Sequence, residues 1–217
     1  MGIKTRFDRL HFVQSVPMPK SATRIQQKNQ ATIMSAGLEV FSQFGFRGST
    51  LDQVAEAAGL SKPNLLYYFP SKDAIYTALL ARLLENWLEP LHKMDDTGDP
   101  VEEILGYAHR KMAMSRDFPR ESRLFANEIL QGAPQIKGVL AGDLRELVEA
   151  KATVINGWIA AGKIKPVDPV HLIFSIWSLT QHYADFDVQV RAILGETDPF
   201  NGAEAHLDNV FRRLLTP

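Results

Sequence analysis

The sequence contains no cysteine, which excludes disulfide bonds and thiolate metal sites. It also contains no apolar run long enough to cross a bilayer, and the apolar patches before residue 26 are shorter than the core of a signal peptide. We therefore expect a cytoplasmic protein without a membrane segment. Its hydrophobic content of 45% is that of a globular chain with a core of ordinary size.

Residue patterns that carry catalysis are missing too. There is no glycine-rich phosphate loop, and no set of His, Asp and Glu residues has metal-ligand spacing. His182 and Asp185 lie three residues apart in a helical pattern, but no third group completes a metal or acid–base site around them. We expect neither an enzyme, nor a metal site, nor a cofactor.

Strand-like alternation and internal repeats are also absent, whereas helical periodicity continues through most of the chain. The predicted fold is therefore all-α. We expect a disordered basic arm over residues 1–25, a three-helix helix-turn-helix head over 26–70, and a ligand-binding and dimerisation domain over 71–217. No flexible linker separates the last two parts, so the helix that starts at Ser71 should join them rigidly.

Proline, glycine and capping residues divide the helical pattern into segments. Gly45 is placed to end the first helix, and Asp168 followed by Pro169 is placed to begin a late one. The predicted helices cover residues 26–44, two short stretches within 49–70, then 71–90, 100–114, 119–130, 135–161, 168–194 and 200–215.

The stretch from Ser49 to Lys72 predicts a helix-turn-helix. Thr50 and Ser61 are good N-caps for two short helices. Ala55 is small enough for a crossing helix, and Gly59, four residues later, tolerates the positive φ of a tight turn. An ordinary helical hairpin with half-buried tyrosines is the alternative.

The second of these helices predicts DNA contacts. If its apolar residues turn inward, Asn64 can read a base edge and Pro63 can touch a thymine methyl. Tyr67, Tyr68 and Lys72 are candidates for phosphate contacts. The predicted DNA-binding residues are Thr50, Ser61, Lys62, Pro63, Asn64, Tyr67, Tyr68 and Lys72.

The charge distribution is consistent with DNA binding by the N-terminal part of the chain. Residues 1–72 hold nine Lys/Arg against four Asp/Glu, a balance of +5, whereas residues 73–217 hold fifteen against twenty-one, a balance of −6. Basic residues of the arm are expected either to add salt-sensitive DNA affinity or to be simply solvated; they are Lys4, Arg6, Arg9, Lys20 and Arg24.

A small-molecule site is predicted in the second part of the chain. Trp177 and Gln181 lie one helical turn apart, with Phe174 on the same face. An indole offers a stacking surface and an amide offers a donor and an acceptor, which suits a planar ring with C=O and N–H groups. Trp87 is placed to close the other side. Plain core packing is the alternative.

The last two predicted helices carry more apolar residues than one buried helix face requires. Such surface either pairs with another subunit or closes the monomer's own core. Because a helix-turn-helix usually needs a twofold partner to span two half-sites, we expect a homodimer. The apolar residues concerned are Leu172, Ile173, Ile176, Trp177, Leu179, Thr180, Ile193 and Leu194 in one helix, and Val210, Phe211 and Leu214 in the other.

The run G-L-S-K-P-N-L-L-Y-Y-F-P-S-K over residues 59–72 resembles the turn and recognition helix of the TetR family of bacterial transcription regulators. Leu66 departs from that pattern, because the family usually has tyrosine there. The resemblance implies a homodimer that binds a palindromic operator in double-stranded DNA, at the bacterial nucleoid.

Within the family, most of the chain after Ala31 is similar to regulators of pyrimidine utilisation. The similar segments include S-Q-F-G-F at 42–46, S-R-D-F-P at 115–119, G-W-I-A-A-G-K at 157–163 and H-L-I-F-S-I-W-S-L-T-Q-H-Y-A-D-F at 171–186. This resemblance implies release from DNA by uracil or thymine, with Trp87, Trp177 and Gln181 at matching positions. A repressor that responds to a different small aromatic metabolite is the alternative.

Overall fold

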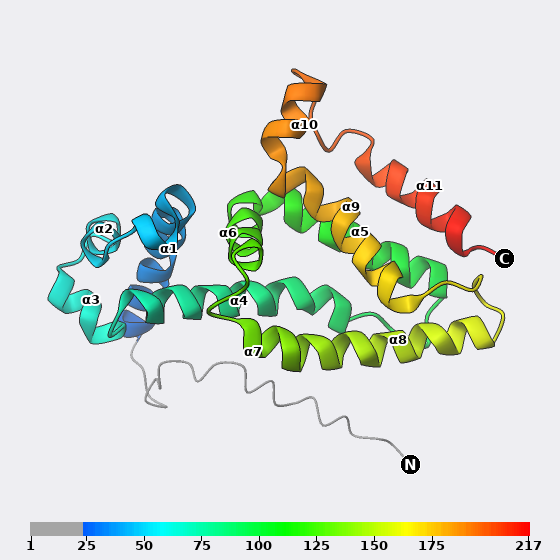
Figure 1. The fold of residues 1–217 in the computed structure, drawn as a ribbon, viewed down its shortest axis with the longest axis horizontal. Coiled ribbons are helices and arrows are strands. Elements are labelled where there is room, and N and C mark those ends of the chain that lie inside the picture. The colour runs from blue at the N-terminus through cyan, green and yellow to red at the C-terminus, as the bar shows by residue number, and fades with distance from the viewer. Residues whose placement is uncertain (1–23) are drawn as a thin grey trace, which may run out of the picture. The chain divides into compact units, whose positions relative to one another are not determined.

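The protein is described from a computed structural model, which covers residues 24–217 (Figure 1). Every regular element in this range is a helix, so the prediction of an all-α fold is confirmed. The predicted basic arm lies outside the described residues, except for Arg24 and Ile25, which begin the first helix. None of the helices in the described range has the length and apolar character needed to span a bilayer.

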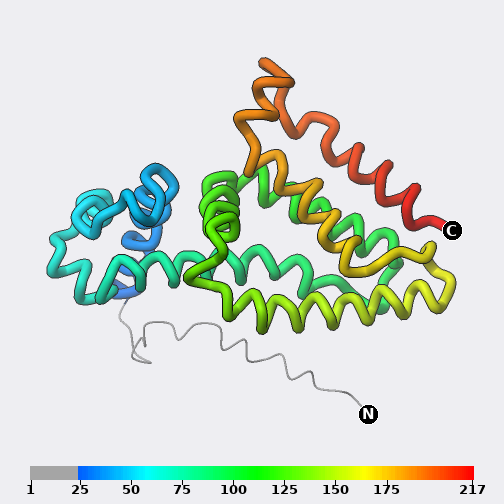
Figure 2. The backbone as a smooth tube through the Cα atoms, in the orientation of Figure 1, coloured from blue at the N-terminus to red at the C-terminus, as the bar shows by residue number. Residues whose placement is uncertain are grey.

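The backbone trace in Figure 2 follows these elements in chain order. They are α1 (Arg24–Gly48), α2 (Leu51–Ala57), α3 (Lys62–Tyr68), α4 (Lys72–His92), α5 (Pro100–Asp117), α6 (Pro119–Leu130), α7 (Lys137–Val139), a π-helical segment (Leu140–Leu144), α8 (Arg145–Ala160), α9 (Pro169–Asp185), α10 (Asp187–Leu194) and α11 (Ala203–Leu215).

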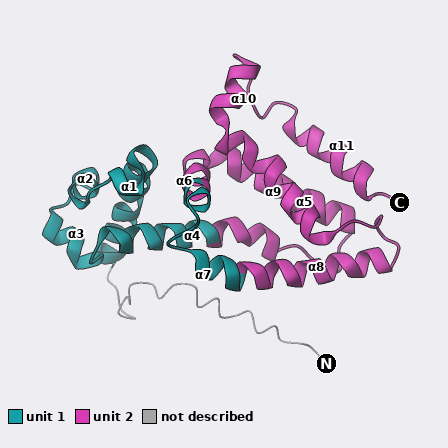
Figure 3. Cartoon of the chain, in the orientation of Figure 1, with its two compact units in different colours: residues 1–84, 127–143 teal, residues 85–126, 144–217 magenta. Residues whose placement is uncertain are grey.

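The described chain forms two compact units (Figure 3). The first contains the residues up to 84 together with 127–143, and the second contains 85–126 and 144–217. Helices α4 and α6 therefore contribute to both units. The division by function after Pro70 is a different boundary and stays a prediction.

The core of the first unit lies where α1 packs against α2. Ile33 of α1, Val54 of α2 and Leu65 of α3 have no exposed surface, because apolar residues at helical spacing all face this core. Gly45, with a φ of 68°, ends the regular part of α1, and Gly59, with a φ of 65°, makes the turn between α2 and α3. Both positions confirm the predicted role of glycine in the left-handed region.

Residues 127–143 belong to the first unit through a buried carboxylate. Glu128 is 3% exposed and accepts hydrogen bonds from the Tyr76 hydroxyl at 3.3 Å and from the Gln135 backbone N–H at 2.8 Å. Burial, together with the negative charge of Glu128, raises the pKa of Tyr76 well above its usual range. The Tyr76 hydroxyl therefore stays protonated and donates a hydrogen bond to Glu128 at all physiological pH values.

The second unit is built on α5, which packs against α9 and α11. Helix α8 also packs against α9. The buried side chains along these contacts are mostly apolar and include Ile104, Leu105, Met112, Leu172, Ile173, Ile176, Leu207 and Phe211.

Two long predicted helices are interrupted. The prediction of one helix over 168–194 is wrong, because α9 ends at Asp185 and α10 begins at Asp187, with Phe186 between them at φ −113° and ψ 30°. The pattern over 135–161 is likewise divided by the π-helical segment. No proline or glycine marks the break at Phe186, so helical periodicity alone could not reveal it.

Several apolar residues predicted for the dimer interface lie in the core of the second unit instead. Leu172, Ile173, Ile176, Thr180 and Phe211 are each no more than 3% exposed. Helix α9 packs against α5 and α8, and α11 packs against α5, so the alternative that these faces close the monomer's own core is correct for these five residues.

Candidate DNA-binding and effector sites

The two short helices of the helix-turn-helix are held by side-chain caps. The Thr50 hydroxyl accepts a hydrogen bond from the Gln53 backbone N–H, and the Gln53 side chain accepts one from the Thr50 backbone N–H at 2.8 Å. The Ser61 hydroxyl accepts from the Asn64 backbone N–H at 3.4 Å. These bonds satisfy backbone donors that a helix start leaves unpaired. The Thr50 and Ser61 hydroxyls thus fix the start of α2 and α3.

Helix α3 has one buried and one exposed face. Leu65 is buried, whereas Lys62, Pro63 and Asn64 are exposed. The Lys62 ammonium lies 2.9 Å from a carboxylate oxygen of Asp52, in an exposed pair that contributes little to stability. The N-terminal turn of α3 therefore presents an amide and an ammonium to solvent, the geometry of a recognition helix.

The two tyrosines of α3 also contact α1. The Tyr68 hydroxyl accepts a hydrogen bond from the Asn29 side-chain amide at 2.9 Å, and the Tyr67 hydroxyl accepts one from the Gln26 amide at 3.3 Å. Tyr68 is half-buried, but Tyr67 remains 71% exposed. Of the two, Tyr67 is the side chain that a phosphate can approach.

Lys72 is held inside the first unit. Its ammonium donates to the carbonyl oxygens of Phe46 and Ser49, both at 2.8 Å, and lies 4.4 Å from the centroid of the Phe46 ring. Phe46 follows Gly45, where the regular part of α1 ends, and Ser49 follows α1 itself, so both carbonyls lie where helix carbonyls lack intrahelical partners. Lys72 therefore ties the start of α4 to the segment that leads into α2.

Replacing Lys72 by alanine is expected to lower the free energy of unfolding by about 1–3 kcal/mol, because the Ser49 carbonyl loses the donor that Lys72 supplies and the Phe46 carbonyl keeps only the Ser49 backbone N–H, at 3.4 Å. Urea unfolding followed by circular dichroism measures this change. Lys62→Ala, which removes the same charge from the exposed pair with Asp52, should shift stability by less than about 0.5 kcal/mol. Equal losses for the two variants would contradict the capping role.

The predicted effector residues of α9 face α5. The Trp177 indole N–H donates to the Tyr107 hydroxyl at 2.6 Å. Tyr107 is 1% exposed, and burial raises its pKa well above the usual range, so the hydroxyl stays protonated. Gln181, one turn beyond Trp177, is half-buried, and its amide makes no hydrogen bond with any residue between 24 and 217. Its donor and acceptor are both available to a ligand.

Trp87 lies at the opposite end of α4 from Lys72. It is 5% exposed, and its indole N–H has no partner in the described part of the chain. The Lys111 ammonium, on α5, lies 4.3 Å from the centroid of its ring. Burial lowers the pKa of Lys111 to about 7, and the negative charge of Asp185 opposes that shift.

Of the other predicted effector residues, Phe174 has a ring contact with Trp177. Its ring lies 5.4 Å from that of Trp177, and it remains 44% exposed. The structure thus brings Phe174 and Trp177 together and leaves Phe174 at the surface of the second unit.

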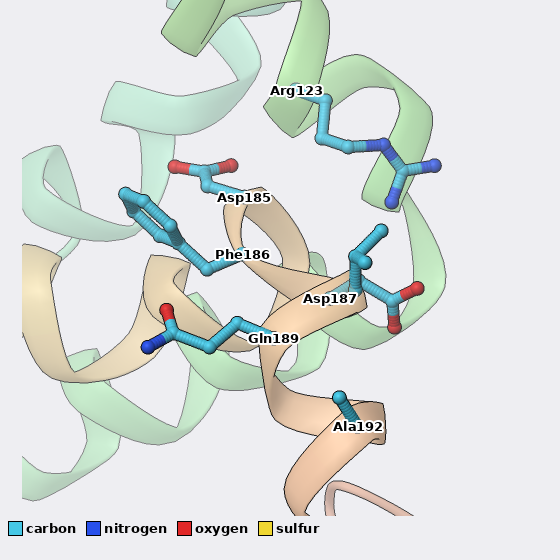
Figure 4. A pocket seen from close by; sticks show the side chains of 7 residues that line it. Arg123, Asp185, Phe186, Asp187, Gln189 and Ala192 are labelled. Atoms are coloured by element: carbon cyan, nitrogen blue, oxygen red, sulfur yellow. The ribbon is translucent and has the colours of Figure 1, made fainter.

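An open pocket of about 640 Å³ lies at the junction of α9 and α10 (Figure 4). None of the four predicted effector residues lines it. Asp185, at its edge, accepts a hydrogen bond from the Ser122 hydroxyl at 2.5 Å, and burial raises the pKa of this carboxyl group. The lining residues are Arg123, Asp185, Phe186, Asp187, Val188, Gln189 and Ala192.

Between residues 24 and 217, no three His, Asp or Glu side chains are grouped so that they could hold a metal ion. The ring of His182 stacks on that of Phe186 with centroids 5.0 Å apart. Asp185, the other member of the weak pair noted in the sequence, is hydrogen-bonded to Ser122.

Sequence reasoning missed Tyr107 and Lys111. They lie one turn apart on α5, on the face that also carries Ile104 and Ala108. A lysine at an apolar position of a helical pattern was the available signal, because lysine is almost never fully buried without a reason.

Comparison with known proteins identifies the class. Residues 33–79 match the family described as bacterial regulatory proteins, tetR family, and residues 80–217 match the C-terminal region of YcdC-like proteins. The chain therefore belongs to the TetR family of DNA-binding transcription regulators, whose members are not enzymes.

The chain is 50% identical over 178 residues to the HTH-type transcriptional regulator RutR of Escherichia coli K12, which covers 82% of this chain and 84% of RutR. It is 26% identical over 141 residues to the regulator YhgD of Bacillus subtilis, covering 63% of this chain and 72% of YhgD. A tetR-family regulatory protein from Rhodococcus RHA1 has the same fold, with a TM-score of 0.71 at 18% identity over 87% of this chain and 97% of that one. The resemblance to the pyrimidine-utilisation type of regulator is thereby confirmed.

Proposed function

We propose that this protein regulates genes of pyrimidine metabolism and that uracil or thymine releases it from a palindromic operator. The proposal depends on one observation: the Gln181 amide, one helical turn from Trp177, has no hydrogen-bond partner among residues 24–217, in a chain that is 50% identical to RutR. A pyrimidine dione has alternating C=O and N–H groups, which an amide matches with one acceptor and one donor. Its flat ring stacks on an indole.

Release requires that the effector bind the DNA-incompetent state more tightly than the DNA-competent one. A coupling free energy of about 1–3 kcal/mol changes operator affinity roughly 5- to 150-fold. Helix α4 is one helix from Lys72 to His92, so a displacement of the part that carries Trp87 also moves the part that follows the recognition helix in the chain. We propose α4 as the element whose position the effector changes.

Binding of purified protein to a palindromic duplex, measured by fluorescence anisotropy with and without uracil or thymine, tests the function. The expected result is tight, salt-dependent binding that weakens as effector is added. Tight binding that no pyrimidine weakens would refute the effector. A thermal-shift screen of other aromatic metabolites would then identify the effector of the alternative regulator.

Asn64 is proposed to read a base edge. Asn64→Ala should relax base preference at one position of each half-site and cost about 1–3 kcal/mol against the preferred base. Its backbone N–H, which bonds Ser61, is unaffected, so α3 keeps its cap. Anisotropy competition with duplexes substituted one base pair at a time measures the effect. An equal loss of affinity for all duplexes would instead indicate that Asn64 contacts a phosphate.

We also propose a homodimer at the nucleoid in the cytoplasm, joined through α9 and α11. The outward face of α9 consists of His171, Phe174, Ser175, Ser178 and His182, which are all exposed. Leu214 of α11 is 42% exposed. Small and aromatic side chains at a spacing of three or four residues permit close approach of a second helix. Two copies would then form a four-helix interface.

A further inference from the structure

Two side-chain amides at the start of α1 bind the two consecutive tyrosines at the end of α3. The Asn29 amide donates to the Tyr68 hydroxyl at 2.9 Å, and the Gln26 amide donates to the Tyr67 hydroxyl at 3.3 Å. Gln26 and Asn29 lie three residues apart and therefore on one face of α1. Both helices belong to the first compact unit.

The direction of these hydrogen bonds determines what the Tyr67 hydroxyl can still do. A phenol hydroxyl has one proton and two acceptor lone pairs, whereas an amide NH₂ group can only donate. The Gln26 amide therefore occupies a lone pair of the Tyr67 oxygen and leaves its proton for another acceptor. Since Tyr67 is 71% exposed, an acceptor outside the protein can reach that proton.

The Tyr67 ring is held as well as its hydroxyl. It meets the Tyr68 ring edge to face, with centroids 5.1 Å apart and planes at 89°. Tyr68 and its donor Asn29 are both half-buried. Asn29 thus fixes Tyr68, whose ring supports that of Tyr67, while Gln26 fixes the Tyr67 hydroxyl. An exposed tyrosine without such contacts would be distributed over several rotamers.

The charges around this pair of helix segments favour an anionic acceptor. Arg24 and Lys28 are exposed at the start of α1, where the first acidic residue is Glu39, and α3 contains no Asp or Glu. The carboxylate of Asp52, on α2, is paired with Lys62. Phosphate oxygens of DNA accept hydrogen bonds from tyrosine hydroxyls, and a hydrogen bond to a charged group is stronger than one between neutral groups.

We propose that Gln26 and Asn29 are positioning residues for DNA binding: they hold Tyr67 so that its hydroxyl proton is donated to a phosphate of the operator backbone. This inference rests on the proposed binding of a palindromic operator and adds two residues of α1 to that site. The contact is independent of base sequence, so it sets how α3 sits on the duplex and not which bases are read.

Fluorescence anisotropy with an operator duplex tests the proposal through double-mutant cycles. Tyr67→Phe, which keeps the ring and removes the hydroxyl, should weaken binding at least about 10-fold. Gln26→Ala and Asn29→Ala should each weaken it about 3- to 10-fold, because the released tyrosine must be ordered on binding. In the Tyr67→Phe background, the same two changes should cost less than about 2-fold, since there is no hydroxyl left to position.

Two further variants of α1 sharpen the test. Gln26→Glu keeps the size of the side chain but replaces the donor by an acceptor, so the Tyr67 hydroxyl donates to it and loses its proton for the phosphate. Its loss of affinity should be smaller in the Tyr67→Phe background, where only repulsion between the carboxylate and DNA remains. Gln27→Ala removes an exposed amide whose side chain makes no hydrogen bond with residues 24–217, and it should bind within about 2-fold of wild type.

The outcomes separate positioning from a structural role and from the function itself. Losses for Gln26→Ala and Asn29→Ala that are equal in both backgrounds would overturn the positioning role. Tyr67→Phe with wild-type affinity would overturn the phosphate contact, and operator binding would still stand. If wild type binds no palindromic duplex, the proposed function fails and this inference fails with it. Urea unfolding checks that each variant is folded, and if Asn29→Ala is not, the cycle of Gln26 with Tyr67 decides alone.

Discussion

Trp177→Ala should abolish release by the effector while operator affinity stays intact. The change removes the stacking surface of the proposed site and leaves the buried Tyr107 hydroxyl without its donor. Loss of an aromatic ligand contact of this size costs about 3 kcal/mol or more, so uracil affinity should fall at least about 100-fold. The readout is operator anisotropy as uracil is added. Trp177 lies on α9, far along the chain from the recognition helix, so binding to DNA alone should not change.

Two further variants control this experiment. Trp177→Phe keeps a ring at the same position and should retain part of the response. Trp158→Phe removes an indole N–H that donates to the Asp96 carbonyl at 3.2 Å in the same unit, and it should release normally. Normal release by Trp177→Ala would show that the effector binds elsewhere, and the pocket between α9 and α10 would then be the next place to test.

Ser178→Arg should convert the homodimer to monomers and weaken operator binding more than about 100-fold. Ser178 lies in the centre of the exposed face of α9 and its hydroxyl bonds only the Phe174 carbonyl, so its own unit tolerates a larger side chain. An arginine there would place a long, charged side chain in the proposed four-helix interface. Because two linked heads bind two half-sites as one molecule, a monomer loses the second binding event.

Sedimentation velocity measures the mass, and anisotropy measures operator binding. Asn156→Arg, at an exposed position on α8, introduces the same side chain outside the proposed interface and should leave both the mass and operator binding unchanged. A dimeric Ser178→Arg variant with wild-type operator affinity would exclude this face of α9 as the interface.

The helix-turn-helix was predictable residue by residue because its determinants are local. Thr50 and Ser61 cap helices whose first donors are two or three residues away. Gly59 adopts the positive φ that only glycine enters easily. Interactions of such short range are encoded in the order of residue types and hardly depend on the rest of the fold.

The effector side was only partly predictable. The spacing of Phe174, Trp177 and Gln181 on one helix follows from helical geometry, but their surroundings do not. Phe174 lies at the surface, whereas the Trp177 indole N–H donates a hydrogen bond to the Tyr107 hydroxyl, 70 positions away in the chain. Lys111 is one of many lysines in the sequence, and only the tertiary structure shows that it is buried against the Trp87 ring.

The amino-acid sequence by itself determined the family, the all-α fold, the capped helix-turn-helix and the basic character of the first 72 residues. Tertiary structure alone decided which face of α9 is core, that Lys72 caps α1, and that Lys111 is buried against the Trp87 ring. The physical reason is the separation along the chain over which each kind of interaction acts. Caps, turns and periodicity depend on neighbours within about four residues, whereas burial and hydrogen-bond pairing depend on which distant segments pack together.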